Sequence, residues 1–160
     1  MVTHEPNFYL DGRCFFYGGH FWNGISQLKQ LLEAHFAHTG RTVSLLWNNL
    51  VKIGKYENKG SPSQEILEWQ DNWFDIVREE VRLLNPDYVI FFTGPYYDKF
   101  IYRIFHDASF EPVNERNERQ LARVKSIHLP IKTIRTYHPN YLWRHGFYKY
   151  LDEIVNAIYC

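Results

Sequence analysis

Three polar clusters in the sequence carry side chains that can recognise a nucleobase, and each follows an apolar stretch. The first contains Asn49, whose amide offers a hydrogen-bond acceptor and a donor on one short side chain. Uracil and thymine present a neighbouring N–H and carbonyl, so one asparagine can pair with both groups. The alternative is a turn or helix-cap asparagine that bonds to its own backbone, and both interpretations stay open.

The second cluster is Thr93-Gly94, directly before Pro95. Proline favours the first position of a helix, and the free N–H groups at a helix start suit an anion or a phosphate. Gly94 would let a ligand approach the main chain closely. A plain strand-to-helix turn explains the same residues equally well.

The third cluster contains His138 and Asn140 on either side of Pro139. Proline restricts the residue before it to extended or turn geometry, so the imidazole would sit on a rigid loop. From there it can face a carbonyl that gains negative charge during bond cleavage. The alternative is a structural histidine. We predict no metal site, because His35 and His38 lie three residues apart with no third ligand evident.

Apolar patterns predict the elements that position these clusters. Apolar runs without polar alternation indicate strands, which we expect at 43–47, 88–92, 124–129 and 132–136. Apolar residues at three- and four-residue steps and proline positions indicate helices, which we expect at 21–38, 63–84, 96–105 and 146–158. Residues 1–20 have no clear period and are expected to be irregular.

Strands that alternate with helices are typical of right-handed βαβ units. We therefore predict an α/β fold in which residues 1–160 form a single three-layer α/β/α domain with a short, mainly parallel central sheet. Open parallel sheets bind ligands at the carboxyl ends of their strands. Each cluster follows a predicted strand, so we expect Asn49, Thr93 and His138 to gather at one ligand site.

Composition limits the classes of partner. The chain carries a net charge of zero, so no global field draws it to nucleic acid or anionic membrane, although a local patch would be enough. Aromatic residues make up 18%, which indicates either a bulky core or stacking surfaces for bases or sugars. Cys14 and Cys160 cannot build a four-cysteine metal site within one chain, and two cysteines fit a reducing cytoplasm.

Targeting signals are not evident in the sequence. No apolar run approaches the length of a membrane span, and the first residues lack the basic and apolar regions of a signal peptide. We therefore expect a cytoplasmic protein with no membrane partner. The oligomeric state is not predicted.

Three motifs, taken together, resemble the uracil-DNA glycosylase-like superfamily over about residues 40–160. Residues 46–52 (LWNNLVK) are similar to its second-strand motif, in which an asparagine after an apolar strand is followed by an apolar pair and often lysine. Residues 80–92 are similar to its leucine-rich helix, proline stop and apolar strand. Residues 136–144 (TYHPNYLWR) are similar to its closing His-Pro-Ser motif.

The resemblance implies roles for these residues. Asn49 would read a base flipped out of DNA, beside a substrate pocket formed with Thr93, Gly94 and Asn140. His138 would bond the base carbonyl and stabilise the departing uracil anion. The loop 139–144 would hold the base extrahelical, and phosphates would contact Lys52 and Arg144. Such hydrolysis of an N-glycosidic bond needs no cofactor.

Two departures from the family pattern keep several hypotheses open. The family's glycine-rich loop supplies an acidic or amide residue that positions water; residues 18–22 (GGHFW) are glycine-rich and aromatic but contain no acid. Asn140 stands where the family has serine. The chain is therefore expected to be a divergent or N-terminally incomplete member. It is either catalytic or a non-catalytic nucleotide or nucleic-acid binding module of the same fold. A third hypothesis is an oligomeric protein that buries exposed aromatics between subunits.

Overall fold

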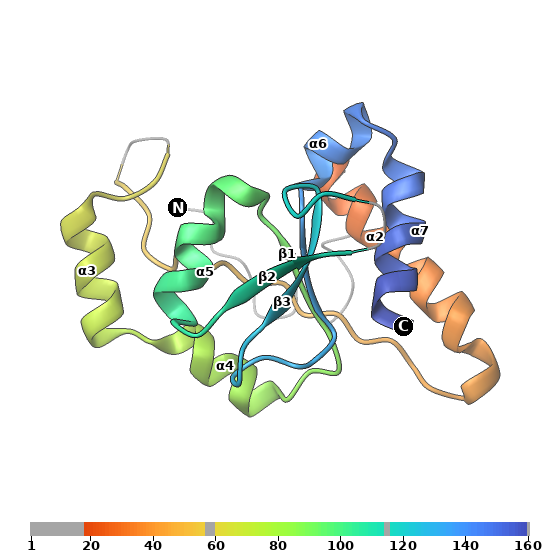
Figure 1. Cartoon of the computed structure of the whole chain (residues 1–160), viewed down its shortest axis with the longest axis horizontal. Helices are drawn as coiled ribbons and strands as arrows, with labels where there is room; N and C mark the ends of the chain where they lie inside the picture. Colours follow the sequence, from red (N-terminus) through yellow and green to blue (C-terminus); the bar gives the residue numbers. More distant parts are fainter. Residues whose placement is uncertain (1–17, 57–59, 114–115, 160) are drawn as a thin grey trace. The chain divides into compact units, whose positions relative to one another are not determined.

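The computed structural model describes residues 18–56, 60–113 and 116–159 (Figure 1). The chain forms two compact units. The terminal unit consists of Met1–Asn48 and Tyr137–Cys160, and the central unit is the continuous segment Asn49–Thr136. The prediction of a single domain over 1–160 stays a prediction.

The terminal unit is helical. Its elements are α2 (Gly19–Phe36), the 3₁₀ helix η2 (Ala37–Thr39), α6 (Pro139–Arg144) and α7 (Phe147–Tyr159). Figure 1 shows α2 beside α6 and α7, and the three helices contact one another. Buried leucines four residues apart on α2, Leu28 and Leu32, give that helix its apolar face. The helices predicted at 21–38 and 146–158 are confirmed, with ends shifted by one or two residues.

The central unit combines helices with a four-stranded sheet. Its elements, in chain order, are α3 (Gln64–Trp73), α4 (Ile76–Leu84), β1 (Val89–Phe92), η3 (Pro95–Tyr97), α5 (Asp98–Ile104), β2 (Ser109–Pro112), β3 (Leu121–Lys125) and β4 (Thr133–Thr136). The strand order is β1-β4-β3-β2. Strand β1 pairs with β4 in parallel, with Phe92 opposite Thr136, whereas β3 is antiparallel to both β4 and β2.

An apolar core joins α4, α5, β1 and β3 of the central unit. Its buried members are Val77, Phe91, Ile101, Ile104, Phe105, Ala108, Val124 and Leu129. Asn85 ends α4 in the left-handed conformation, with φ 43°, directly before Pro86. The predicted stop at this proline and the predicted strand at 88–92 are therefore confirmed.

The predicted α/β class is confirmed, because the structure has helices and a mixed sheet. A mainly parallel sheet is not confirmed, since β1–β4 is the single parallel pair in the described residues. The reason lies in the connections: no described helix lies between β2 and β3 or between β3 and β4. Parallel neighbours require a long crossover, whereas short links favour antiparallel pairing.

The predicted strand at 43–47 is wrong, because residues 41–49 lie outside helices and strands. Leu46 in this segment is 60% exposed, so its apolar run is not covered on both faces as a central strand would be. The predicted helix at 63–84 divides at Phe74 and Asp75 into α3 and α4. None of the helices in the described residues is long and apolar enough to cross a membrane.

Candidate functional site

Four rings of the terminal unit, one of them the imidazole of His138, form a cluster. Phe21 stacks on the imidazole, with ring centres 5.1 Å apart and planes 27° apart. The edge of Phe21 meets Trp22 at 5.0 Å and Trp47 at 6.0 Å, and the two tryptophans lie 5.7 Å from each other. We call His138, Phe21, Trp22 and Trp47 the His138 cluster. It joins the start of α2, the segment after η2 and the residue that caps α6.

Glycines of α2 allow the helix to approach this cluster. Gly18 and Gly19 have positive φ angles of 76° and 81°, a conformation that glycine adopts readily, and α2 begins there. One turn further, a Cβ at Gly24 would lie 3.0 Å from Cβ of Pro139 and 3.1 Å from the Phe147 ring. The absence of a side chain at Gly24 therefore lets α2 pack directly on the residue after His138.

His138 is held as a neutral hydrogen-bond donor. Its backbone is extended, with φ −56° and ψ 141°, as the following proline requires. Its Nδ1 accepts the backbone N–H of Asn140 at 3.2 Å, so the proton of the ring belongs on Nε2. Burial against its neighbours lowers the pKa of His138 below the ordinary 6.5. Part of the surface of His138 is still exposed to solvent.

Thr93 and Gly94 end β1 in the central unit. Gly94 has a φ of 70°, and its N–H donates to the Thr136 carbonyl at 2.8 Å. This N–H is therefore committed to the sheet edge rather than available to an anion. The hydroxyl of Thr93 is buried and has no hydrogen-bond partner among the residues that the structure describes.

Asn49 and Lys52 also belong to the central unit. Asn49 is exposed. The Nζ of Lys52 lies 2.6 Å from a carboxylate oxygen of Glu80, so a phosphate would have to compete with this ion pair. The side chain of Gln70, which is 5% exposed, forms hydrogen bonds with the backbone of Leu50 and Lys52. Its amide accepts the Lys52 N–H at 2.8 Å and donates to the Leu50 carbonyl at 3.4 Å.

A buried ion pair lies close to the same end of β1 and β4. Arg135 on β4 is fully buried, and its guanidinium donates to Asp98 at 3.0 Å and to the Arg119 carbonyl at 2.9 Å. Burial raises the pKa of Asp98, although Arg135 acts in the opposite direction. The pair attaches the first residue of α5 to the sheet.

The structure brings together His138 and Asn140 in the terminal unit, and Thr93 and Gly94 in the central unit. Arg144 belongs to the terminal unit and ends α6. Because these sets belong to different units, their convergence on one ligand stays a prediction.

Sequence reasoning did not find Phe21 or Trp47 as neighbours of His138, nor the partnership of Asp98 with Arg135. The glycine- and aromatic-rich run at 18–22 was a signal for the first. A charged residue inside the predicted strand 132–136 was a signal for the second.

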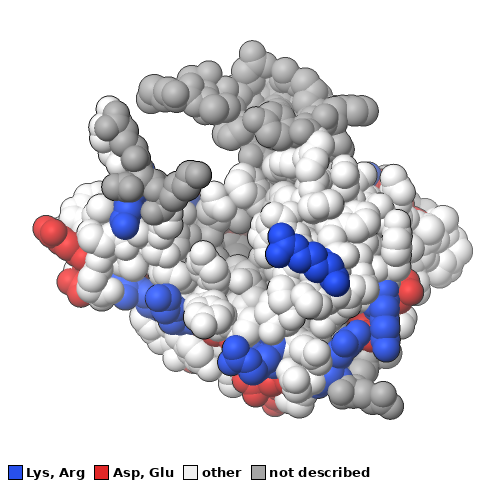
Figure 2. Space-filling view, turned by 90° about the horizontal axis from the view of Figure 1, so that it is seen from above, with Lys and Arg blue, Asp and Glu red and all other residues white. Residues whose placement is uncertain are grey.

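The distribution of charged and metal-binding side chains limits which ligands the described residues can hold. On the face shown in Figure 2, the lysine and arginine side chains of the described residues are scattered among uncharged ones. Phosphates on this face would meet individual cations rather than a continuous patch. Within the described ranges, no group of three or more His, Cys, Asp or Glu side chains could hold a metal ion.

Comparison with known proteins gave no relative: no family model, curated protein or solved structure matches this chain.

Proposed function

We propose that the protein is a uracil-DNA glycosylase-like protein that recognises an unstacked base in DNA. The observation that carries the proposal is the hydrogen bond from the Asn140 N–H to Nδ1 of His138. It fixes the tautomer in which Nε2 donates, and the lowered pKa keeps the ring neutral at physiological pH. A neutral donor can bond a base carbonyl and strengthens that bond as negative charge develops there.

In the catalytic form of the proposal, the oxygen of a water molecule bonds to C1′ of the deoxyribose and releases a proton to solvent as the bond between C1′ and the base breaks. The electron pair of the C1′–N bond goes to the base, whose carbonyl oxygen gains charge opposite the Nε2–H of His138. The Phe21 ring covers one face of the imidazole that carries this donor and shields that face from water.

That Asn49, Thr93 and His138 share one ligand is part of the proposal and rests on the sequence, in which each of them follows an apolar run. The proposal also retains the finer fold expectation of a three-layer α/β/α domain; of the three strand pairs in the described residues, β1–β4 is the parallel one.

A second candidate, a non-catalytic nucleic-acid binding module, is favoured by one observation. Burial is the single cause of the lowered pKa of His138. A nearby carboxylate would raise that pKa, so no described acid acts on the ring. The glycine-rich run 18–22, which is compared with the loop that carries the family's water-positioning residue, also contains no acid.

Assays of DNA binding and of base release distinguish the two candidate functions. We expect the protein to retard uracil-containing or single-stranded DNA on a native gel, and His138→Ala to weaken that binding. His128→Ala, which removes an exposed histidine of the central unit, is the matched control. Abasic sites that accumulate in uracil-containing DNA support the enzyme. Bound DNA without abasic sites supports the non-catalytic module, and absence of binding contradicts both.

A further inference from the structure

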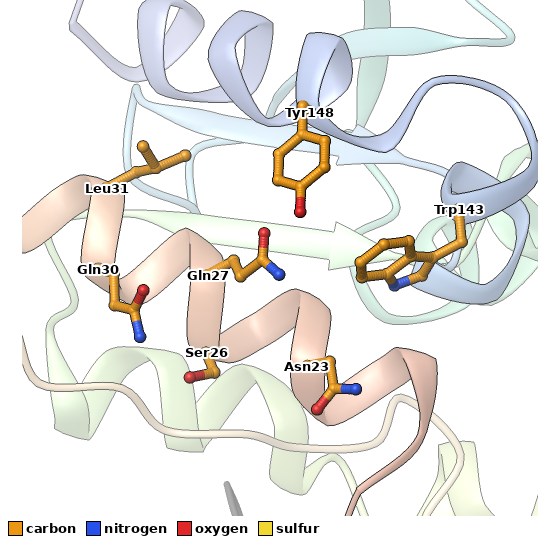
Figure 3. Close-up of a pocket in the computed structure, with 7 residues that line it drawn as sticks. All are labelled: Asn23, Ser26, Gln27, Gln30, Leu31, Trp143 and Tyr148. Carbon is orange, nitrogen blue, oxygen red and sulfur yellow. The ribbon is translucent and has the colours of Figure 1, made fainter.

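A groove on the terminal unit lies between α2, α6 and α7, with a volume of about 470 Å³ (Figure 3). One wall consists of uncharged polar side chains of α2, namely Asn23, Ser26, Gln27 and Gln30. Trp143 of α6 and Tyr148 of α7 form the other side. The volume is in the range of small-ligand sites, and none of the described residues that line the groove is charged.

The three amides form a row along α2. Asn23, Gln27 and Gln30 are spaced by four and three residues, so they share one helix face over about 10 Å. Figure 3 shows the Gln27 amide and the Tyr148 hydroxyl pointing toward one another across the groove. None of the three amides has a side-chain hydrogen bond within the described part of the chain. Each amide therefore offers both a donor and an acceptor to a ligand.

On the aromatic side of the groove, Trp143 is held in place by its neighbours and Tyr148 is exposed. The Trp143 indole donates its N–H to the His20 carbonyl at 3.0 Å and stacks on Phe147, with centres 4.2 Å apart and planes 6° apart. Tyr148 is 62% exposed. Its ring is available for a flat ligand to stack on, beside an indole that cannot turn away.

Two cations follow these rings in the sequence and lie outside the groove lining, because neighbouring residues of a helix point about 100° apart, so they would meet phosphates beyond the rim of the groove. Arg144 follows Trp143 and Lys149 follows Tyr148, and both are exposed. Neither makes an ion pair among the residues that the structure describes. Stacking rings, amides that can pair with base edges, and unpaired cations together are the features with which proteins hold single strands.

We infer that this groove binds an unpaired stretch of nucleic acid, with a base on Tyr148, base edges on the α2 amides and phosphates on Arg144 and Lys149. A neutral saccharide would use the amides and the rings but would leave the two cations without a role. An asparagine or glutamine amide pairs with N6 and N7 of adenine, so an adenine strand is the natural probe. The inference goes beyond the proposed function, since the groove includes neither His138 nor Asn49.

Fluorescence anisotropy with labelled single-stranded oligodeoxyadenylate tests the groove, because this probe contains no uracil or thymine. We expect Tyr148→Ala to weaken binding about fivefold or more, as loss of one stacked base does. The slope of log K against log salt is expected to fall by about 0.7 in Lys149→Gln, the value for one phosphate contact on a single strand. Tyr56→Ala and Lys55→Gln repeat both substitutions on exposed residues of the central unit and are expected to bind as the unaltered protein does.

Binding of uracil-containing duplex DNA, measured on the same variants, separates the groove from the proposed base site. Tyr148→Ala is expected to leave that binding unchanged. No binding of oligodeoxyadenylate, an equal loss in Tyr56→Ala and Tyr148→Ala, or displacement of the oligonucleotide by a neutral oligosaccharide each overturns the inference.

Discussion

The neutral state of His138 results from two local features at the residue scale. The Asn140 N–H occupies Nδ1, and burial of the ring disfavours its charged form. We expect the imidazole to titrate below 6.5 in an NMR titration, and Phe21→Ala to move its pKa upward, because Phe21 covers one face of the ring. Phe36→Ala, a change of the same type at the far end of α2, is the control and should leave the titration in place.

The sign of the accompanying stability change follows from the lowered pKa. The unfolded chain binds a proton at His138 more readily than the folded chain does, so folding is favoured above about pH 6.5. This contribution is lost as the pH falls through the folded pKa. A titration midpoint at or above 6.5, or no response to Phe21→Ala, would contradict the prediction and remove the neutral donor from the proposed chemistry.

The Asp98–Arg135 pair leads to a second prediction at the residue scale. Arg135→Met leaves the Asp98 carboxylate, whose side chain is 18% exposed, without its cation. Loss of one partner from a buried pair costs about 3–5 kcal/mol in unfolding free energy, measurable by urea denaturation followed by circular dichroism. Arg82→Met, which breaks an exposed pair with Glu79, should change stability little.

The double variant Arg135→Met/Asp98→Leu distinguishes an uncompensated charge from simple loss of packing. We expect it to recover much of the stability lost in Arg135→Met, because no buried charge then stays unpaired. A double variant as unstable as the single one would show that the Arg119 carbonyl, which also loses its donor, carries the effect.

At the element scale, the amino-acid pattern predicted a helix or strand correctly where its apolar residues are the ones that the structure buries. The helix at the C-terminal end has a clear helical period and the strand before Thr93 is a continuous apolar run, and both are present. The run 43–47 has strand composition but no strand partner in the structure. The residues after this run are held instead by hydrogen bonds to the side-chain amide of Gln70 on α3. No local sequence pattern encodes this contact.

Gly24 gives a prediction about how the helices of the terminal unit pack. Alanine at this position gains about 1 kcal/mol in helix propensity. Its Cβ would lie 3.0 Å from Pro139 and 3.1 Å from Phe147, which Trp143 stacks against, so neither neighbour yields easily. Overpacking costs about 1–3 kcal/mol, so we expect Gly24→Ala to lower the unfolding free energy by about 1 kcal/mol net.

Thermal or urea unfolding measures this effect, and Ala34→Gly on the exposed side of α2 calibrates the propensity term within the same helix. If Gly24→Ala stabilises the protein by the amount that Ala34→Gly destabilises it, α2 has room for a methyl group, and the close approach to Pro139 is not required.

At the scale of the whole molecule, two of the predicted site residues, Asn49 and His138, lie where the chain passes from one unit to the other. Asn49 is the first residue of the central unit, and His138 is the second residue after the chain returns to the terminal unit. The sequence identified both residue types because each follows an apolar run and has recognisable chemistry. It could not supply the rings around His138, since Phe21 and Trp47 are distant in the chain and make no local pattern with it.

This division makes coupling between the units the deciding measurement for the proposed function. If Asn49 and His138 bond to the same base, loss of one weakens the contact of the other, and their effects on affinity do not add. We therefore expect Asn49→Ala and His138→Ala each to weaken binding of uracil-containing DNA. The binding free energy of the double variant should lie within about 1 kcal/mol of that of the single variant that binds more weakly. Asn49→Ala combined with His128→Ala, which changes a histidine outside the proposed site, should be additive. Additivity in both pairs would place the two side chains on separate ligands, and base recognition by Asn49 and His138 together would then be wrong.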